Sequence, residues 1–279
     1  MQSPLTVETQ RELEILKMTE QNKQKLVFKV GTSSLTHEGG RINLDRVEKL
    51  VTVLADLCNM GHKVALVTSG AIGVGTGKLG LSQKPSDVPG RQAAATVGQC
   101  ELMFLYDKFF TQFGHKVGQL LITKEDMEDE KRYLNLTNTF AKLFDFGAIP
   151  IINENDAVAT EEIVYGDNDT LSAMVASVIK ADKLIILTET DGLYDSNPQD
   201  NPSAKHIDLV ANITQEVLDF AGDSKTSMGT GGMKTKLRAA TIATNNGIDT
   251  YIIAGQDPKK IYDLLEGKQV GTLFLKQKQ

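Results

Sequence analysis

The sequence predicts an α/β fold, a three-layer αβα sandwich with a mostly parallel central sheet. Two observations support this prediction. Short apolar runs alternate with segments of helical periodicity from Leu26 to the end of the chain. The runs are apolar at almost every position, which is typical of parallel strands that helices cover on both faces. Ligands of such folds bind beyond the carboxyl ends of the strands, so we expect the functional residues there.

The first elements illustrate the pattern. LVFKV at Leu26–Val30 is an apolar run that ends at a glycine, which is typical of a buried strand. The next segment carries apolar residues with a period of 3.6, with Asn43 placed to cap a helix and Gly61 placed to end it. Further strands are expected at KVALVTSG, VGQLLI, AIPIIN, KLIILT, DTYIIA and GTLFL, and further helices near residues 91–113, 131–146, 170–180, 215–221, 234–246 and 258–265.

Composition excludes several classes of function. Of 279 residues, 36 are acidic and 30 are basic, and no long basic run occurs, so we expect no nucleic-acid partner. Cys58 and Cys100 lie in helix-like apolar patterns and are interpreted as free core thiols, which fits a reducing compartment. No apolar run is long enough for a membrane span, and no signal-peptide pattern begins the chain. We therefore expect a cytoplasmic protein without membrane contacts.

An unusual acidic segment, INENDAVATEEIVYGDNDTLSA, extends from Ile152 to Ala173. It contains six carboxylates and three asparagines but no histidine, cysteine, lysine or arginine. One interpretation is a solvated loop. The alternative is the lip of a pocket that binds an ammonium group, because the segment begins at the carboxyl end of a predicted strand.

Two segments have features of anion-binding sites. KVGTSS, at Lys29–Ser34, places a lysine, a glycine and hydroxyl residues at the end of a strand. GTGGMKTK, at Gly229–Lys236, is a glycine-rich loop that opens a predicted helix. Backbone N–H groups at such turns bind phosphate oxygens, and LTETDGLY after another strand fits the same nucleotide site. An ordinary turn and a plain flexible loop are the simpler alternatives.

A third glycine-rich segment, VTSGAIGVGTGKLG, follows the strand that ends near Val67. The N–H groups of Ser69 and Gly70 can receive a carboxylate or a phosphate. A GxGxxG pattern at Gly75, Gly77 and Gly80 suggests a nicotinamide oxidoreductase, but it lies several residues too far from the strand. We therefore interpret these three glycines as sites of close helix packing.

The residue types indicate phosphoryl transfer to an acceptor that needs no general base. The four histidines lie far apart without metal-ligand spacing, and no pattern indicates an activated nucleophile, so we expect no resident metal ion. A carboxylate acceptor is already ionised at neutral pH. It needs cations, because two unit charges about 4 Å apart repel by about 4 kcal/mol at an effective dielectric constant of about 20. Lys29 and Lys236, with Mg²⁺ carried by ATP, can supply them.

The order KVGTSS, VTSGAIGVG, GQLLIT, INENDAVAT, GDNDTLSA and GTGGMKTK resembles the glutamate 5-kinase family of the amino-acid kinase superfamily. The resemblance extends from about Lys25 to Leu275, and INENDAVAT with GDND is its most specific part. It implies the amino-acid kinase fold and ATP-dependent phosphorylation of the side-chain carboxylate of L-glutamate. This reaction is the first step of proline biosynthesis, and the resemblance implies feedback inhibition by proline.

The resemblance also implies roles for individual residues. The catalytic residues would be Lys29 and Lys236, which stabilise the transferring phosphoryl group, and Asp169, which holds both lysines. The residues implied for glutamate are Ser69, Gly70, Asp156 and Asn168. Those implied for ATP are Lys29, Gly31, Thr188, Glu189, Thr230, Gly231, Gly232, Met233, Lys234, Thr235 and Lys236. Residues 25–279 would form the kinase domain, with glutamate bound by its N-terminal part and ATP by its C-terminal part.

Some expectations depart from the family pattern or lie outside it. Many relatives have Asp where this chain has Glu189, and many carry a C-terminal PUA domain to which the resemblance does not extend. Residues 1–24 are an N-terminal extension to which we assign no role. We expect a homo-oligomer. A sensor that binds an amino acid or a nucleotide without catalysis is an alternative, but sensing does not require Lys29, Asp169 and Lys236 together.

Overall fold

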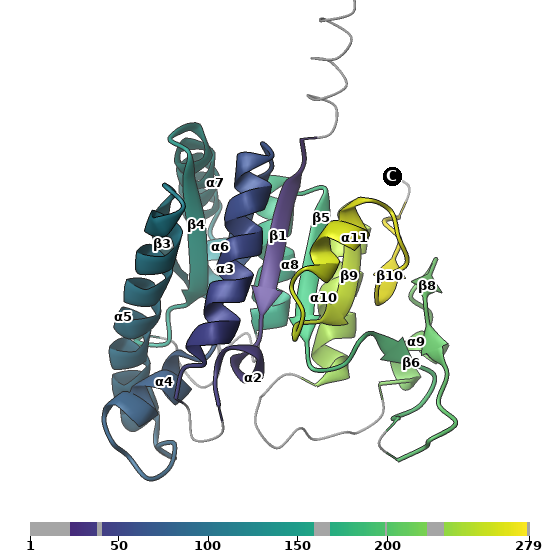
Figure 1. The fold of residues 1–279 in the computed structure, drawn as a ribbon, viewed down its shortest axis with the longest axis horizontal. Coiled ribbons are helices and arrows are strands. Elements are labelled where there is room, and N and C mark those ends of the chain that lie inside the picture. Colours follow the sequence, from purple (N-terminus) through teal and green to yellow (C-terminus); the bar gives the residue numbers. More distant parts are fainter. Residues whose placement is uncertain (1–22, 38–40, 159–167, 199, 222–231, 278–279) are drawn as a thin grey trace, which may run out of the picture.

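The central sheet confirms the predicted mostly parallel α/β fold. The computed structural model describes residues 23–37, 41–158, 168–198, 200–221 and 232–277. Within these ranges the main sheet has eight strands in the order β3-β4-β2-β1-β5-β9-β10-β8 (Figure 1). Neighbours from β3 to β9 pair in parallel, and β10 runs antiparallel to β9. The strands are β1 (Lys25–Val30), β2 (Lys63–Val67), β3 (Lys116–Ile122), β4 (Ala148–Glu154), β5 (Lys183–Thr188), β8 (Leu209–Val210), β9 (Asp249–Ala254) and β10 (Thr272–Phe274).

Helices cover both faces of this sheet and complete the three layers. In Figure 1, α3, α5 and α11 lie in front of the strands, and α7, α8 and α10 lie behind them. The helices of the two layers are α3 (Leu44–Asn59), α5 (Val88–Gln112), α11 (Lys260–Leu265), α7 (Glu130–Asp145), α8 (Asn168–Ile179) and α10 (Met233–Asn245). Shorter elements are α2 (Thr32–Leu35), α4 (Ala71–Lys78), α6 (Lys124–Glu128), α9 (Gln215–Asp219) and the hairpin of β6 (Leu193–Tyr194) with β7 (His206–Ile207).

Strand β1 shows why nearly continuous apolar runs mark this sheet. Leu26 and Phe28 point into the core cluster formed with α3 and α5, whereas Val27 points into the cluster formed with α8 and α10. All three side chains are fully buried. Successive side chains of a strand face opposite sides, so a strand between two helical layers must be apolar at both sets of positions.

The predicted caps of α3 are present. The side chain of Asn43 accepts a hydrogen bond from the backbone N–H of Arg46 at 3.1 Å. Gly61 has φ +92°, a left-handed conformation that glycine adopts without steric cost. Helix α5 starts three residues before the predicted Arg91, at Val88, because Asp87 caps its N-terminus and a proline is tolerated in the first turn.

The glycines of the displaced GxGxxG pattern lie in and after helix α4. A Cβ atom on Gly75 would lie 1.7 Å from the carbonyl oxygen of Ala94 in α5, which confirms close helix packing at this position. At Gly80 the packing interpretation is wrong. This residue has open space around it and φ +69°, so it supplies a left-handed turn after the helix. Since the pattern does not form the turn after β2, it gives no support to a nicotinamide site.

The interpretation as a core thiol is wrong for Cys100, whereas Cys58 packs against the core cluster as predicted. Cys58 is partly buried, and burial raises the pKa of its thiol to about 12. Cys100 is exposed, because its position on α5 turns toward solvent although the helix carries a buried apolar face. No helix in the described part of the chain is both long enough and apolar enough to cross a bilayer.

The topology places the predicted functional segments at one edge of the sheet. The chain moves from β1 to β2 in one direction, but β5 pairs with β1 on its other side. A parallel sheet opens a crevice at such a reversal, at the carboxyl ends of the strands. Lys29 and Ser69 follow this rule, because they lie at the ends of β1 and β2.

Candidate active site

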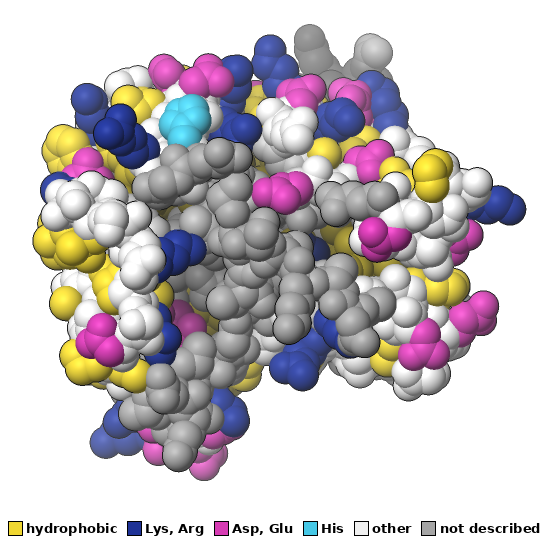
Figure 2. Space-filling view, turned by 90° about the horizontal axis from the view of Figure 1, so that it is seen from below, with side chains coloured by type: hydrophobic (Ala, Val, Ile, Leu, Met, Phe, Trp, Pro, Cys, Tyr) yellow, Lys and Arg dark blue, Asp and Glu magenta, His cyan; other side chains and the backbone are white. Residues whose placement is uncertain are grey.

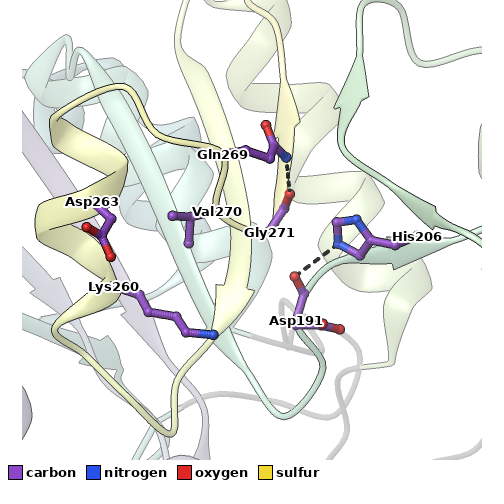
Figure 3. Close-up of a pocket in the computed structure, with 7 residues that line it drawn as sticks. All are labelled: Asp191, His206, Lys260, Asp263, Gln269, Val270 and Gly271. Carbon is purple, nitrogen blue, oxygen red and sulfur yellow. Dashed lines mark hydrogen bonds between the residues drawn. The ribbon is translucent and has the colours of Figure 1, made fainter.

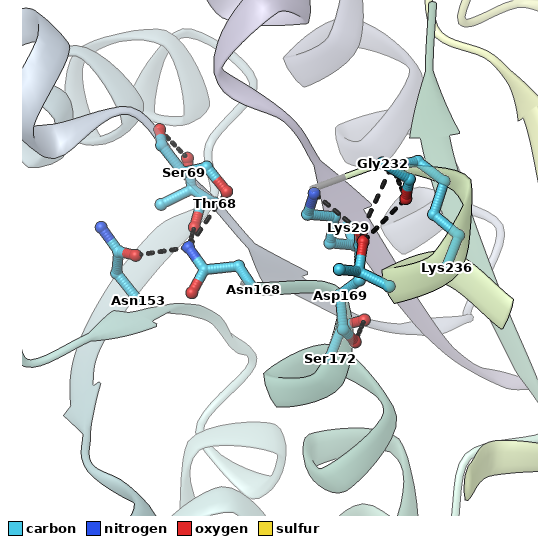
Figure 4. A network of polar contacts seen from close by, with 10 residues as sticks. Lys29, Thr68, Ser69, Asn153, Asn168, Asp169, Ser172, Gly232 and Lys236 are labelled. Atoms are coloured by element: carbon cyan, nitrogen blue, oxygen red, sulfur yellow. Dashed lines mark hydrogen bonds and ion pairs between the residues drawn. The ribbon is translucent and has the colours of Figure 1, made fainter. Parts of the chain in front are cut away.

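Two lysine side chains converge on one carboxylate at the carboxyl edge of the sheet. Lys29 comes from the end of β1, Asp169 from the first turn of α8, and Lys236 from the first turn of α10. Nζ of Lys29 lies 2.7 Å from Oδ1 of Asp169, and Nζ of Lys236 lies 3.2 Å from Oδ2 (Figure 4). The three residues that carry the proposed catalytic roles are therefore in direct contact.

Burial strengthens the electrostatic interactions of Asp169 with Lys29 and Lys236. Asp169 is fully buried, and Lys29 and Lys236 are only 6 % and 7 % exposed. Desolvation by itself raises the pKa of Asp169, but the charges of Lys29 and Lys236 outweigh it and hold this pKa below its usual range. Asp169 is therefore ionised at neutral pH and fixes two cations in a site of low polarity.

Helix α10 contributes two more groups beside Asp169. The hydroxyl of Thr235 lies 2.7 Å from Oδ2 of Asp169 and 2.8 Å from the carbonyl oxygen of Gly232. Nζ of Lys236 also lies 3.5 Å from that carbonyl. Gly232 is the residue immediately before α10, and Met233 is its first residue. The side chains of Thr235 and Lys236 thus join the start of α10 to the buried carboxylate.

A second cluster surrounds the amide of Asn168, the first residue of α8. Its Nδ2 lies 2.6 Å from the backbone oxygen of Thr68, 2.8 Å from Oδ1 of Asn153 and 3.0 Å from Oγ of Ser69, so its two N–H groups are shared among three acceptors. Figure 4 shows this cluster on one side of the start of α8 and the lysines with Asp169 on the other. Since Asn168 and Asp169 are adjacent, one helix start joins the two clusters.

The second cluster extends into α5. Asn153, at the end of β4, accepts from the backbone N–H of Glu154 at 2.9 Å and donates through Nδ2 to Oε1 of Gln99 at 2.8 Å. Asn153 and Gln99 are 2 % and 8 % exposed. The hydroxyl of the fully buried Tyr106 lies 2.7 Å from Oγ1 of Thr68 and supports the other side of the network.

Asp156 is a partly buried carboxylate just beyond β4. Burial raises its pKa to about 6. It makes no hydrogen bond or ion pair with the residues that the structure describes. A carboxylate in this state gains from an ammonium partner, because pairing would offset the cost of keeping it charged.

The remaining predicted residues lie around these clusters. Gly70 has φ +98° and precedes α4, and Gly31 joins β1 to α2 beside Nζ of Lys29. Thr188 ends β5, where its carbonyl accepts from Gly255 at 2.7 Å, and Glu189 is exposed in the loop that follows. Lys234 lies in the first turn of α10. The expectations for Thr230, Gly231 and residues 1–22 lie outside the described residues.

Sequence reasoning missed three members of the site, namely Thr68, Gln99 and Asn153. A signal was present for Gln99. It lies four residues after Ala95 and three before Leu102, and both of these residues are buried on α5. A polar residue at such a position of a helix enters the core and must find a partner there.

A separate shallow cavity of about 280 Å³ lies between α11, the segment before β10 and the β6–β7 hairpin (Figure 3). Asp191, His206, Lys260 and Asp263 line it. The ring of His206 bonds to the carbonyl of Asp191 at 3.2 Å and to a carboxylate oxygen of Asp208 at 2.8 Å. The two lysine–carboxylate pairs at Asp169 do not line this cavity, so it is distinct from the converging cluster.

The view onto the carboxyl edge shows how charge is distributed there. In Figure 2, basic and acidic side chains of the described residues lie on several sides of the central region. The described part of this edge therefore carries charges of both signs.

Comparisons with known proteins agree with this geometry. A model of the amino acid kinase family matches residues 24–254. The chain is 53 % identical over 254 residues to glutamate 5-kinase of Clostridium acetobutylicum, which covers 91 % of this chain and 95 % of that protein. It is 49 % identical to the glutamate 5-kinase of Clostridium perfringens, with coverage of 91 % and 96 %. For the 49 % identical enzyme of Caldanaerobacter subterraneus subsp. tengcongensis, the match covers 91 % of this chain and 68 % of the relative.

Solved structures share the fold at low sequence identity. UMP kinase of Bacillus anthracis superposes with a TM-score of 0.63 at 16 % identity, covering 91 % of this chain and 97 % of that one. Carbamate kinase of Giardia lamblia, solved with AMP-PNP, gives 0.64 at 16 % identity, with coverage of 91 % and 99 %. These matches confirm the predicted amino-acid kinase fold. Together with the family model and the relatives near 50 % identity, they show that this chain belongs to the amino acid kinase family, among the glutamate 5-kinases.

Proposed function

We propose that this protein transfers the γ-phosphoryl group of ATP to the side-chain carboxylate of L-glutamate and forms L-glutamyl 5-phosphate, the first step of proline biosynthesis. The observation that carries the proposal is the convergence of Lys29 and Lys236 on Asp169, at 2.7 and 3.2 Å. The glutamate 5-kinases that share about half of its residues over nearly the whole chain supply the substrate.

The lysines act on the phosphoryl group. An ammonium has three N–H donors, so each lysine can bind a phosphoryl oxygen while it remains paired with Asp169. The acceptor carboxylate and the γ-phosphate are both anions, and two fixed cations reduce their repulsion as they approach. Because the cations are already in place, little reorganisation accompanies the reaction. No general base is required, since the attacking oxygen carries no proton at neutral pH.

The second cluster, around Asn168, binds glutamate. Asp156 pairs with the α-ammonium group, which relieves the cost of its own burial. The hydroxyl of Ser69 accepts from Asn168, so its proton is free to donate to a substrate carboxylate. Asn168 and the N–H of Gly70 complete the contacts. The adjacency of Asn168 and Asp169 then brings the glutamate side chain next to the lysines.

ATP binds along the C-terminal side of the edge, over β5 and the start of α10. Thr188 and Glu189 contact the nucleoside, and Gly31 with Lys29 contacts the terminal phosphate. Residues 230–236, which include Thr230, Gly231, Gly232, Met233, Lys234 and Thr235, receive the phosphates at a helix start. Glu189 brings an oxygen one methylene further out than the aspartate of many relatives.

Mg²⁺ accompanies ATP rather than residing in the protein. Asp169, the carboxylate at the phosphoryl site, is already engaged by two lysines, and this donor set suits phosphate oxygens better than a metal ion. Bound with the nucleotide, Mg²⁺ would supply further neutralisation of phosphate charge. Lys29 and Lys236 add two fixed positive charges and position the γ-phosphate.

Three further properties complete the proposal. The kinase domain spans residues 25–279, with glutamate on its N-terminal part and ATP on its C-terminal part. The protein works in the cytoplasm as a homo-oligomer. Proline inhibits it by competing for the glutamate seat, because proline resembles a cyclised glutamate that lacks the reactive carboxylate.

Release of ADP tests the proposed function directly. The purified protein is incubated with MgATP and, separately, with L-glutamate, L-aspartate and N-acetyl-L-glutamate. We expect ADP formation that depends on glutamate and is at least tenfold slower with the other two acids. Equal turnover with all three acids, or none with glutamate, would contradict the proposal.

A further inference from the structure

The amide of Asn168 is held in one orientation by a backbone group that cannot reverse its role. Its Nδ2 lies 2.6 Å from the carbonyl oxygen of Thr68, which can only accept a hydrogen bond. If the amide were turned over, Oδ1 would face this carbonyl and also Oδ1 of Asn153. The observed orientation leaves Oδ1 of Asn168 without a donor among the described residues.

Asn153 is oriented in the same way. Its Oδ1 accepts from the backbone N–H of Glu154 at 2.9 Å, and an N–H can only donate. Its Nδ2 therefore points away from that N–H and needs an acceptor, because Asn153 is 2 % exposed. Oε1 of Gln99, at 2.8 Å, is that acceptor.

Gln99 accepts the hydrogen bond of Asn153 through Oε1, but its own Nε2 has no hydrogen-bond partner in the described structure. This nitrogen is fully buried. A buried amide nitrogen without a partner is unfavourable, and a glutamine chosen only for packing would be replaced by an apolar residue of the same length at no such cost. The position therefore indicates a requirement for the oxygen of Gln99.

We propose that Gln99 is a positioning residue for the glutamate site: acting through Asn153, it keeps the carbonyl oxygen of Asn168 available to accept a hydrogen bond from the α-ammonium group of the substrate. The inference rests on the proposed glutamate kinase activity. Asp156 then supplies the charge that attracts the ammonium group, and the oriented carbonyl of Asn168 supplies direction. This relay, the hydrogen-bonded series of Gln99, Asn153 and Asn168, makes the site selective for acceptors that carry a free amino group.

Loss of the Gln99 oxygen leaves Nδ2 of Asn153 buried and unpaired. Asn153 then gains by rotating toward another partner, which withdraws its Oδ1 from Asn168. Asn168 loses one of the contacts that fix its amide, and the α-ammonium group loses an oriented acceptor. The reacting carboxylate and ATP are bound by other residues, so their interactions stay in place.

The test compares Gln99→Met, which removes both polar atoms at similar length, with Gln99→Glu, which keeps an oxygen toward Asn153. Gln112→Met is the matched control, because it makes the same change at an exposed position of the same helix. Steady-state assays give kcat and the KM values for glutamate and ATP. The inhibition constant of glutarate, which has both carboxylates but no amino group, reports on the pocket without the ammonium contact.

For Gln99→Met we expect a rise of about threefold to tenfold in the glutamate KM, the factor of one net hydrogen bond. The glutarate inhibition constant, the ATP KM and kcat should stay within about twofold, as should every constant of Gln112→Met. The glutamate KM of Gln99→Glu should rise less than that of Gln99→Met, because an oxygen still faces Asn153. An unchanged glutamate KM in Gln99→Met overturns the proposal, and so does an equal rise for glutamate and glutarate. If Gln99→Met does not fold, a glutamate KM raised more than about threefold in Gln99→Glu overturns it.

The proposed function and the relay can fail separately. A wild-type protein that releases no ADP with glutamate contradicts the kinase assignment. A wild-type protein that is active with glutamate, beside a Gln99→Met variant with unaltered acceptor preference, contradicts only the role of Gln99.

Discussion

Lys29 and Lys236 bind the two oxygens of one carboxylate, that of Asp169, although they come from a strand at the start of the domain and a helix near its end. A buried carboxylate with two buried cations leaves a net positive charge in a poorly solvated place. Such an arrangement is costly in a protein that only needs stability. It is useful where an anion with several negative charges arrives, and this explains why the cluster lies at the carboxyl edge of the sheet.

Removing the ammonium group of Lys29 or of Lys236 should strongly slow phosphoryl transfer but leave glutamate binding nearly unchanged. We expect Lys29→Ala and Lys236→Ala each to lower kcat by about a hundredfold or more, the range for losing one pre-positioned charge or donor. The glutamate KM should change by less than about threefold, because Ser69, Asp156 and Asn168 are the residues proposed to bind the acceptor. Lys108→Ala, at an exposed position of α5, is the control. Wild-type turnover in either variant would eliminate the assigned role.

Asp169→Asn should damage both activity and stability. The change leaves two buried ammonium groups without a counter-charge, so we expect a loss of about 3–5 kcal/mol in the free energy of unfolding by urea at pH 7. Because the lysines lower the pKa of Asp169 from 3.8, its contribution is complete above that value and is lost as pH falls through the folded pKa. The gap between wild type and variant should therefore persist at pH 5 and narrow only below about pH 4. A gap that closes already at pH 5 would contradict the ion pairs.

Asp156 gives the glutamate site its expected pH dependence. Its carboxyl must be ionised to pair with the ammonium group, and its pKa is raised to about 6 by burial. We expect the glutamate KM to rise as pH falls below 6, approaching tenfold per unit, while Asp156→Asn has a high KM that hardly depends on pH. Saturation curves between pH 5 and 8 provide the measurement. A wild-type KM that is constant over this range would reject the assignment.

The same carboxylate should weaken the protein in the absence of substrate. A pKa raised from 3.8 to about 6 means that the folded state prefers the protonated form, so the charge is unfavourable above pH 6 and harmless below 3.8. We expect Asp156→Asn to stabilise the free protein at pH 8 by about 1–3 kcal/mol and to have no effect near pH 3.5. Urea unfolding at the two pH values decides between this outcome and a uniform effect of the substitution.

The sequence predicted most of the fold because the central strands β1, β2, β4 and β5 are buried on both faces, and because α3 begins at a recognisable cap, Asn43. β1, β9 and α3 lie within one residue of their expected positions. The sequence singled out Lys29 and Lys236, since lysines beside glycine-rich turns are local patterns, whereas the role of Asp169 was implied only by the resemblance to the glutamate 5-kinase family. Their convergence could not be read from spacing, because it depends on how the strands are ordered in the sheet.

The sequence did not reveal which residues far apart in the chain contact one another. Gln99 and Asn153 are far apart in sequence and meet only because α5 packs over the sheet near the end of β4. Cys100 was assigned to the core from a helix-like apolar pattern, and Gly80 was assigned to helix packing because its glycine pattern lies too far from the strand, but neither residue faces the core. A helix turns by 100° at each residue, so apolar neighbours in sequence do not fix the direction of one side chain.

Proline should compete with glutamate if both occupy the seat formed by Ser69, Asp156 and Asn168. We expect proline to raise the apparent glutamate KM without lowering the limiting rate, and to have a smaller effect in Asp156→Asn, since its secondary ammonium loses the same partner. Glutamate saturation curves at several fixed proline concentrations provide the test. Curves that keep their half-saturation point and lose only amplitude would place proline elsewhere.

The contact between α4 and α5 should tolerate no side chain at its two central glycines. A Cβ atom on Gly98 would lie 1.8 Å from the carbonyl oxygen of Ala71, and one on Gly75 would lie 1.7 Å from that of Ala94. Both obstacles are backbone atoms, so the helices must move apart, and Ser69 and Gln99 would separate with them. We expect Gly98→Ala to lower the free energy of unfolding by about 3 kcal/mol or more and to raise the glutamate KM.

Gly114→Ala distinguishes this steric effect from the general cost of replacing glycine. Gly114 has φ +78° and open space around it, so we expect a loss of only about 1–2 kcal/mol and normal kinetics. Urea unfolding gives the two free energies, and saturation curves give the two KM values. Equal losses in the two variants would show that the helices can separate freely, and a Gly98→Ala protein with an unaltered glutamate KM would show that the packing of α4 on α5 does not position Ser69 and Gln99.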